Sequence, residues 1–191
     1  MSRQVEETVE EIVAACNSMA GLPYDGEPVD QLEHALQCAA LARGSGGERE
    51  FVIACLLHDI ARAPAVAGIA YDSPDEHHGE SGARWLEPRV GARIAWLAEQ
   101  HVPAKRYLVA TDEWYRGQLT EVSERTLMAQ GGPMNADEVE SFRASPDWGL
   151  AVALRQIDDR GKVPGAVVPD LDAYRADLRD VVAARLTPGP R

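Results

Sequence analysis

The sequence predicts an all-α protein, and two observations support this prediction. Apolar residues recur at helical spacing through most of the 191 residues, whereas no stretch alternates convincingly between apolar and polar residues with a period of two. Histidines and aspartates also lie in or beside the most apolar segments, where a polar side chain needs a buried partner. We therefore expect a bundle of helices with a polar site in its interior.

The two ends of the chain carry amphipathic patterns. One apolar stripe follows residues 5–19 and another follows residues 171–186, so two outer helices are expected there. Residues 35–42 and 51–60 are apolar nearly all round, which is typical of buried helices. Residues 44–47, with three glycines, supply the turn between these two buried helices.

Local signals predict where several other helices begin. Pro28 suits the first turn of the helix that carries His34. Residues 73–76 have the form of a capping box and would open a helix carrying His77 and His78. Two further helices are expected at residues 90–98 and 151–160.

The composition limits the classes of partner. The net charge of -12 argues against binding to nucleic acid or to an anionic membrane surface, so an anionic small molecule would need a local basic pocket. The polar N-terminus predicts no signal peptide, and no apolar run reaches about 18 residues, so we expect no membrane span and a cytoplasmic location. The three cysteines lie in apolar segments and are expected to be buried reduced thiols.

The chain has five histidines, and two of them lie in the most apolar segments. A single buried histidine, such as His34 or His58, more often bonds a backbone carbonyl or a carboxylate than a metal. Asp59, however, follows His58 at the end of an apolar run, where an ionised carboxylate is costly unless a cation neutralises it. A divalent metal with neutral imidazoles would do so. Such a pair by itself is weak evidence for a metal.

The order of residues strengthens the metal hypothesis. His34, the pair His58-Asp59 and Asp158 follow one another in an order that resembles the HD-domain superfamily, helical proteins in which these four residues bind one metal. In the two-metal branch of that superfamily, two further histidines hold a second ion and the aspartate of the pair bridges both. The resemblance therefore implies a helical bundle with a dinuclear site in its core, made by His34, His58, Asp59, His78, His101 and Asp158.

Three longer segments carry a more specific resemblance. Residues 24–39, 101–109 and 126–134 are similar to the PhnZ-type HD-domain oxygenases of phosphonate breakdown. The similarity extends from about residue 24 to residue 162, so we expect one domain over residues 1–191, with this core and flanking terminal helices. His78 is preferred to His77 because the family's histidine is followed at four and five residues by Gly-Ala, here Gly82-Ala83.

This resemblance implies an oxidoreductase with two iron ions in a mixed-valence Fe(II)/Fe(III) state and O2 as co-substrate. Members oxidise a small 1-hydroxyphosphonate and break its C–P bond, which releases phosphate and a carboxylic acid. One known substrate, (R)-2-amino-1-hydroxyethylphosphonate, yields glycine, and its trimethylammonium analogue yields glycine betaine. Hydroxymethylphosphonate is a third. Imidazole and carboxylate ligands also suit manganese or zinc, so ligand type alone leaves the metal open.

The resemblance also assigns substrate contacts. Lys105, Ser123 and Arg155 match positions that bind the phosphonate, a dianion that suits charge-assisted hydrogen bonds. Arg106 is expected to be structural and to pair with a carboxylate. Arg62 is a departure, because relatives often have Gly-His where this chain has Ala61-Arg62. It would add a phosphonate contact or alter the pocket.

Tyr24 and Glu27 match a lid. In the amine-processing relatives this tyrosine ligates an iron when substrate is absent, and the glutamate receives the ammonium of the substrate. Their presence here favours a substrate with a cationic substituent. The alternative is that they are a turn residue and a carboxylate near a helix N-terminus.

Two other functions remain open from the sequence. An HD-domain phosphohydrolase would use the same ions to activate water against a phosphate ester or a nucleotide. A non-catalytic HD-fold binding module would usually show a broken set of ligands, whereas all six positions are filled here. The lid residues, Lys105 to Tyr107 and the run from Gln130 to Met134 favour the oxygenase. The oligomeric state is not predicted.

Overall fold

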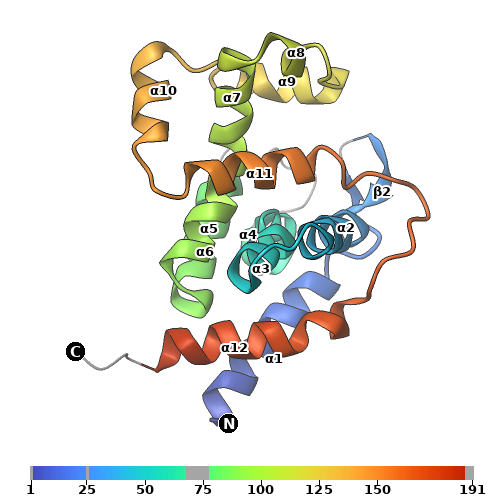
Figure 1. Cartoon of the computed structure of the whole chain (residues 1–191). Coiled ribbons are helices and arrows are strands. Elements are labelled where there is room, and N and C mark those ends of the chain that lie inside the picture. Colours follow the sequence, from blue (N-terminus) through green and yellow to red (C-terminus); the bar gives the residue numbers. More distant parts are fainter. Residues whose placement is uncertain (1, 25, 68–77, 188–191) are drawn as a thin grey trace.

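The computed structural model describes residues 2–24, 26–67 and 78–187, and these ranges are mostly helical (Figure 1). They form twelve α-helices, two 3-10 turns and one short hairpin, so the all-α prediction is confirmed. In chain order the helices are α1 (Arg3–Asn17), α2 (Gln31–Gly44), α3 (Arg49–Leu57), α4 (Pro64–Ala67), α5 (His78–Val90), α6 (Ala92–Glu99), α7 (His101–Thr111), α8 (Glu113–Arg116), α9 (Glu121–Ala129), α10 (Ala136–Arg143), α11 (Trp148–Asp158) and α12 (Arg175–Leu186). No helix among the described residues is long and apolar enough to cross a membrane.

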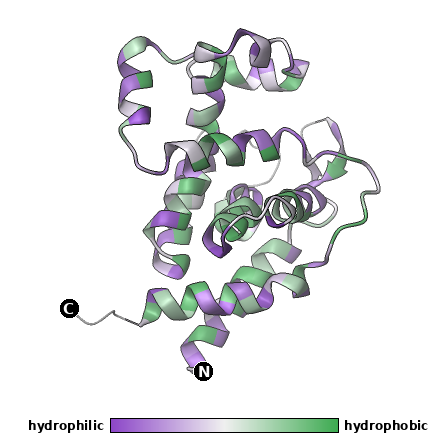
Figure 2. Ribbon diagram, viewed as in Figure 1, coloured by the Kyte–Doolittle hydropathy of each residue, from purple (hydrophilic) through white to green (hydrophobic). Residues whose placement is uncertain are grey.

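The core has two parts. The larger apolar cluster is formed by α1, α2, α3, α5, α6, α11 and α12, and the smaller one lies among α7 to α11. Figure 1 shows α11 running between these two groups of helices. The terminal helices α1 and α12 pack against each other and carry both polar and apolar residues along their length, as Figure 2 shows. This agrees with the predicted amphipathic outer helices. The three cysteines are buried and free, as expected.

A short antiparallel hairpin precedes α2. Strands β1 (Pro23–Tyr24) and β2 (Glu27–Asp30) pair around a turn in which Gly26 has a φ of 82°. The prediction that Pro28 lies in the first turn of a helix is wrong, because Pro28 belongs to β2. Asp30 instead forms a capping box with Glu33, and these reciprocal hydrogen bonds start α2 at Gln31. The hairpin thereby brings Tyr24 and Glu27 close to the helix that carries His34.

The predicted buried helix at residues 51–60 ends earlier than expected. Helix α3 stops at Leu57, His58 is its C-cap, and Asp59 lies between this helix and a 3-10 turn over Ile60–Arg62. The two residues of the pair therefore do not share a regular helix. Asp59 has left the helical conformation, with φ of -102° and ψ of 17°. Its carboxylate lies in the interior at a turn between elements.

Other boundaries shift by a few residues. Helix α6 begins at Ala92 because Gly91, with a φ of 95°, separates it from α5. Helix α11 covers Trp148–Asp158, three residues earlier than predicted at its start. The proposed capping box at residues 73–76 and His77 lie outside the described residues, and α5 is described from His78 onward.

Candidate metal centre and active site

Two pairs of buried histidines face each other in the interior. His34, on α2, and His58, after α3, approach with their Nε2 atoms 3.2 Å apart. His78 and His101, the first residues of α5 and α7, approach with their Nε2 atoms 2.9 Å apart. All four side chains are almost fully buried. The fold thus brings together four histidines that the sequence spreads over 68 positions.

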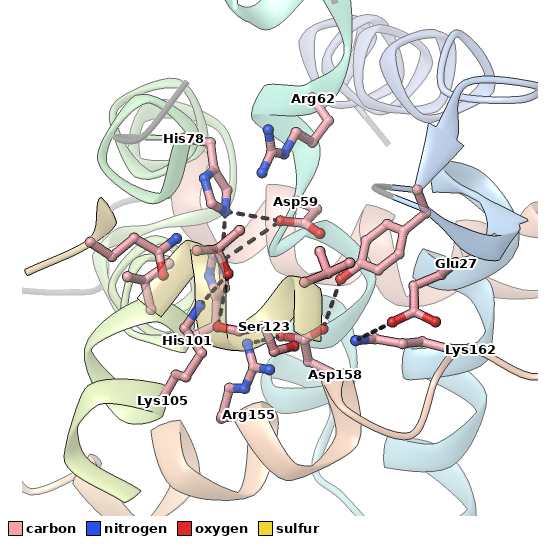
Figure 3. Close-up of a pocket in the computed structure, with 15 residues that line it drawn as sticks. Glu27, Asp59, Arg62, His78, His101, Lys105, Ser123, Arg155, Asp158 and Lys162 are labelled. Carbon is pink, nitrogen blue, oxygen red and sulfur yellow. Dashed lines mark hydrogen bonds and ion pairs between the residues drawn. The ribbon is translucent and has the colours of Figure 1, made fainter. Parts of the chain in front are cut away.

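Asp59 lies between the two pairs, as Figure 3 shows for one of them. Its Oδ2 atom is 3.5 Å from Nε2 of His58 and 3.9 Å from Nε2 of His34. Its Oδ1 atom is 3.3 Å from Nε2 of His78 and 3.6 Å from Nε2 of His101. Each carboxylate oxygen therefore faces one pair of imidazoles, which is the arrangement expected of a bridging ligand.

The outer nitrogens of three imidazoles are held by backbone carbonyls. Nδ1 of His34 donates to the carbonyl of Gly161 at 2.9 Å, and Nδ1 of His58 donates to that of Cys55 at 2.9 Å. Nδ1 of His101 donates to the carbonyl of Ala98. This assignment of protons leaves Nε2 of a neutral ring as a bare acceptor. Two bare acceptors facing each other repel unless a metal ion lies between them or one ring takes up a proton, and carbonyl contacts of this kind commonly orient metal ligands.

Asp158, the last residue of α11, completes the first pair. Its Oδ1 atom is 3.3 Å from Nε2 of His34, and the hydroxyl of Tyr24 donates to the same oxygen at 3.1 Å. The ring of Tyr24 also stacks on that of His34 with centroids 4.1 Å apart. Asp158, His34 and His58 thus present an oxygen and two nitrogens to one point.

The surroundings of Oδ1 of Asp59 indicate whether metal ions fit this site. This oxygen is buried and accepts no hydrogen bond from the part of the chain that the structure describes. A buried carboxylate oxygen without a donor is costly, and a cation bound by the facing imidazoles would remove that cost. Asp59, His78 and His101 offer ligand atoms within 4.8 Å of one another. The six residues fit two metal ions that share Asp59.

Cys38 lies beside the same site and could be mistaken for a ligand. Its Sγ atom is 3.6 Å from Nε2 and 3.9 Å from Nδ1 of His34. His34, Cys38 and His58 offer ligand atoms within 4.8 Å of one another, but the sulfur is nearly equidistant from both nitrogens of His34 and so does not lie directly in front of Nε2. Burial, followed by the charge of Asp158, raises the pKa of this thiol well above its usual value. Cys38 therefore packs against the ligand His34.

The charged groups of the site shift one another's pKa values. Burial alone would raise the pKa of both aspartates, but His58 and His78 hold that of Asp59 well below its usual range, and Arg155 does the same for Asp158. Burial opposes protonation of His58, yet the two carboxylates raise its pKa to about 9. Burial and then the charge of His78 lower the pKa of His101 to about 3. Carboxylates ionised in a buried site favour binding of cations.

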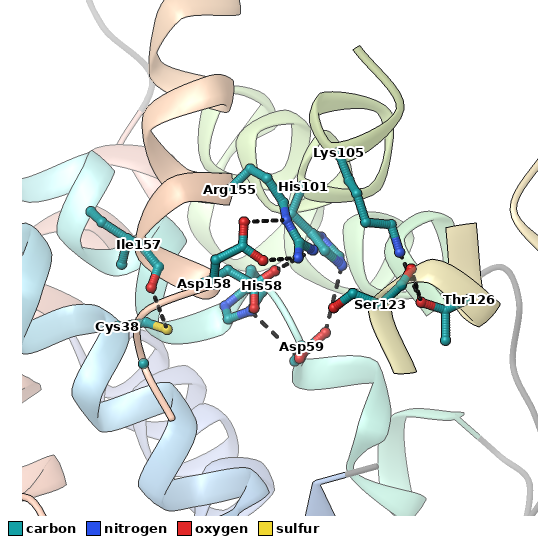
Figure 4. Close-up of polar contacts among 12 residues, drawn as sticks. Cys38, His58, Asp59, His101, Lys105, Ser123, Thr126, Arg155, Ile157 and Asp158 are labelled. Carbon is teal, nitrogen blue, oxygen red and sulfur yellow. Dashed lines mark hydrogen bonds and ion pairs between the residues drawn. The ribbon is translucent and has the colours of Figure 1, made fainter. Parts of the chain in front are cut away.

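A cavity of about 60 Å³ opens beside these ligands. All six predicted substrate and lid residues line it, namely Tyr24, Glu27, Arg62, Lys105, Ser123 and Arg155. Lys105, on α7, donates from Nζ to Oγ1 of Thr126 at 2.9 Å, as Figure 4 shows. Burial and then the charge of Arg155 lower the pKa of Lys105 to about 7. The cavity therefore places cationic side chains next to the ligand cluster, although the whole chain is acidic.

Arg155 has more partners than the sequence suggested. It donates from Nη1 to Oδ2 of Asp158 at 2.8 Å and also pairs with Asp159. Its Nε atom donates to the hydroxyl of Tyr115 at 3.0 Å, and that hydroxyl donates to Asp159 at 2.6 Å. Arg155 therefore positions Asp158 in addition to lining the cavity. Arg106 does not line this cavity. It pairs with Glu138 at 2.7 Å, which agrees with the expectation that it pairs with a carboxylate.

Several lining residues were not predicted from the sequence. They are Val102, Val122, Thr126, Gln130 and Lys162. Lys162 follows Asp158 by four residues and pairs with Glu27, with Nζ 3.6 Å from Oε1. One signal was available, because Lys105 and Lys162 are the only lysines of a chain with 19 basic residues. Both of them line this cavity.

Comparisons with known proteins agree with this geometry. The HD domain family model matches residues 32–128. A [1-hydroxy-2-(trimethylamino)ethyl]phosphonate dioxygenase (glycine-betaine-forming) of Leisingera caerulea is 40% identical over 149 residues, which are 77% of this chain and 76% of the relative. A hydroxymethylphosphonate dioxygenase of Gimesia maris is 38% identical over 167 residues, which are 83% of this chain and 80% of the relative. An uncharacterised protein of Acanthamoeba polyphaga mimivirus is 32% identical over 176 residues, which are 90% of this chain and 80% of that protein.

Proposed function

This chain belongs to the HD-domain family and, within it, to the phosphonate oxygenases, and from that membership we propose that it cleaves the C–P bond of a small 1-hydroxyphosphonate with O2. The substrate would be 2-amino-1-hydroxyethylphosphonate or a close analogue, and the products would be phosphate and a carboxylic acid such as glycine. The observation that carries the proposal is the placement of Asp59, whose two oxygens face two separate pairs of histidines beside a basic cavity.

The six clustered side chains would hold the metals. His34, His58, Asp59 and Asp158 would bind one ion, and Asp59, His78 and His101 would bind the other. Two iron ions in the mixed-valence Fe(II)/Fe(III) state would supply the electron transfer and the O2 activation that this oxidation needs. The protein contributes the carbonyls of Gly161, Cys55 and Ala98, which orient three of the four imidazoles so that the Nε2 lone pairs of His34, His58 and His101 face inward.

The reaction balances without another reductant. A 1-hydroxyphosphonate R–CH(OH)–PO3²⁻ and O2 give R–COO⁻, HPO4²⁻ and one proton. The C–P bond and the C1–H bond break, C1 is oxidised by four electrons, and O2 is reduced by the same number. Each product gains one oxygen atom if the hydroxyl oxygen stays on carbon. The protein therefore has to hold the phosphonate still, expose C1 to the metals and provide groups that accept protons.

The cationic residues would hold the phosphonate. Lys105, Arg155 and Ser123 line one side of the cavity, and Arg62 adds a fourth donor group. A phosphonate dianion would bind here through charge-assisted hydrogen bonds, because cations in a largely buried cavity interact strongly with anions. Partial burial of Lys105 means that its charge is fully present only when an anion is bound or the pH is low.

Tyr24 and Glu27 would form the lid. The hydroxyl of Tyr24 is hydrogen-bonded to Asp158, so it lies within the ligand cluster when no substrate is bound. Burial, together with the charge of Asp158, raises the pKa of this phenol well above its usual value. Tyr24 would thus be a hydrogen-bond donor that substrate displaces, and its ring would shield the ligand His34 from water.

The test is a measurement of metal content followed by turnover. We expect anaerobically purified protein to carry two iron ions per chain. Hydroxyphosphonates should then release one phosphate for each O2 consumed, and removal of O2 should abolish the release. Phosphate release from an ester without O2 would instead support the phosphohydrolase. Tight binding of phosphonates without any turnover would support a binding module.

A further inference from the structure

Lys162 lies at the end of the cavity away from Lys105, beside the predicted lid (Figure 3). Its Nζ atom is 3.6 Å from Oε1 of Glu27 and 5.5 Å from the ring centroid of Tyr24. The side chains of Lys162 and Glu27 are only 13% and 18% exposed. The pair is therefore partly desolvated, so its charges interact more strongly than those of a surface pair.

The backbone around Lys162 is held in place on both sides. The carbonyl of Gly161 accepts from His34, and the amide of Gln37 exchanges two hydrogen bonds with the backbone of Val163, at 2.9 and 3.0 Å. A Cβ atom at Gly161 would lie 2.6 Å from Sγ of Cys38, which leaves room only for glycine. The side chain of Lys162 therefore extends from a fixed stretch of backbone, and this backbone directs it toward Glu27.

The ion pair of Lys162 with Glu27 changes the net charge at the end of the cavity where the substituent of a substrate would bind. A phosphonate bound by Lys105 and Arg155 would direct its other substituent toward Glu27, which lies across the cavity (Figure 3). Glu27 alone would attract an ammonium group at this end. With Lys162 beside it, the carboxylate is already neutralised. An incoming ammonium would have to displace Lys162 and then share the cavity of about 60 Å³ with a second cation.

We propose that Lys162 is a specificity-determining residue, which by pairing with Glu27 biases the cavity toward 1-hydroxyphosphonates whose substituent is uncharged and against those whose substituent is cationic. The proposal rests on the C–P cleavage proposed above and narrows its substrate class: among the analogues considered there, those with an uncharged substituent become the better substrates, and 2-amino-1-hydroxyethylphosphonate becomes a poorer one.

Two substitutions, each of which removes one charge of the Lys162–Glu27 ion pair, distinguish a role in substrate specificity from a purely structural role. Lys162→Gln leaves Glu27 negative, whereas Glu27→Gln leaves Lys162 positive. The probes are ethylphosphonate and 2-aminoethylphosphonate, which differ by an ammonium group and lack the 1-hydroxyl that is oxidised. Isothermal titration of the metal-loaded protein gives the ratio of their two Kd values.

The two variants should shift that ratio in opposite directions. Lys162→Gln should favour 2-aminoethylphosphonate by about tenfold relative to wild type, and Glu27→Gln should disfavour it by a similar factor, as expected for one partly buried charge. Lys162→Arg, which keeps the charge, should stay within about twofold of wild type, as expected for retained Coulomb energy. Arg160→Gln, which removes an exposed charge two residues away, should also leave the ratio unchanged.

The outcomes distinguish this proposal from the proposed reaction. Shifts in the same direction for both variants, or ratios that never change by more than about twofold with metal content and circular dichroism intact, would overturn the role of Lys162. Opposite shifts without phosphate release from any hydroxyphosphonate would support the role of Lys162 in charge selection and overturn the reaction. Opposite shifts with O2-dependent phosphate release would support both.

Discussion

Arg155 donates from Nη1 to Oδ2 of Asp158 at 2.8 Å, and both residues are buried on α11 (Figure 4). The bond leaves Oδ1 of Asp158 to face His34 and Tyr24. One arginine thus fixes which oxygen of the aspartate is turned toward the ligand cluster. The same guanidinium lines the cavity, so the proposed phosphonate site and the proposed metal site share a side chain.

Loss of Asp59 should remove both metals. Asp59→Ala deletes the only side chain whose oxygens face both pairs of histidines in the described structure. We expect iron content to fall from two ions per chain to nearly none, measured by elemental analysis after anaerobic reconstitution. Asp172→Ala, at an aspartate whose side chain is 76% exposed, is the control and should retain both ions. Retention of two tightly bound ions by Asp59→Ala would rule out the bridge.

Loss of Lys105 should weaken substrate binding more than turnover. Lys105→Ala should raise KM for a hydroxyphosphonate by about 10- to 100-fold, the size expected for one charge-assisted hydrogen bond, with a smaller change in kcat. Lys105→Arg should restore part of the loss because it keeps the charge. An unchanged KM in the alanine variant would remove Lys105 from the phosphonate site.

The lowered pKa of Lys105 also predicts a pH dependence. Its pKa of about 7 means that the free enzyme holds a charged ammonium below pH 7 and loses it as the pH rises above that value. A phosphonate dianion prefers the charged form, so kcat/KM should fall on the alkaline side of about pH 7. Lys105→Arg stays charged throughout and should flatten that limb. An identical alkaline limb in both proteins would assign it to another group.

The hydroxyl of Tyr115 should support the metal site through Arg155. Tyr115→Phe removes one acceptor of Arg155 and one donor to Asp159, and should lower the free energy of unfolding by about 1 kcal/mol. We also expect metal affinity to fall by about 3- to 10-fold, less than the roughly 10- to 100-fold typical of groups that contact a metal ligand directly, because Tyr115 acts through Arg155. Tyr107→Phe is the matched control, because its buried hydroxyl accepts from Arg143 away from the site. Equal metal affinity in both variants would mean that Tyr115 contributes only to the stability of the fold and not to metal binding.

A methyl group at Gly161 should disturb His34 through crowding. In Gly161→Ala the new Cβ would lie 2.6 Å from Sγ of Cys38 and 3.3 Å from Nδ1 of His34. We expect weaker metal binding, seen as a lower midpoint of chelator-induced metal loss. The double variant with Cys38→Ala relieves the closest contact and should recover much of the affinity. No recovery would place the damage in the backbone carbonyl of Gly161 instead.

The helical class and the six clustered side chains could be predicted because their signals are strong. Period-3.6 patterns mark buried and amphipathic helices, and the spacing of His34, His58-Asp59 and Asp158 resembles a known order of ligands. The start of α2 was missed because the reciprocal bonds of Asp30 and Glu33 outweigh the preference of Pro28 for a helix start. The end of α3 was missed because the apolar pattern continues through Ile60 beyond the turn at Asp59.

The pairing of Glu27 with Lys162 could not be predicted by local reasoning. The two residues are 135 positions apart, and each alone is typical of a solvated surface residue. The network of Arg155 with Tyr115 and Asp159 was missed for the same reason, since Asp159 by itself resembles an exposed carboxylate in the sequence. Only the scarcity of lysine in a chain rich in arginine pointed to position 162.

The five residues from Asp158 to Lys162 provide three groups: the carboxylate of a proposed metal ligand, a carbonyl that orients His34 and an ammonium beside Glu27 of the proposed lid. A related protein that acts on other phosphonates can therefore differ in the side chain at residue 162 or 27. Insertions or backbone changes in residues 158–162 would instead displace Asp158 and the carbonyl of Gly161, and would disrupt the proposed metal site. Substrate range in such proteins should diverge by point replacement at the two ends of the ion pair, while the length of this stretch stays constant.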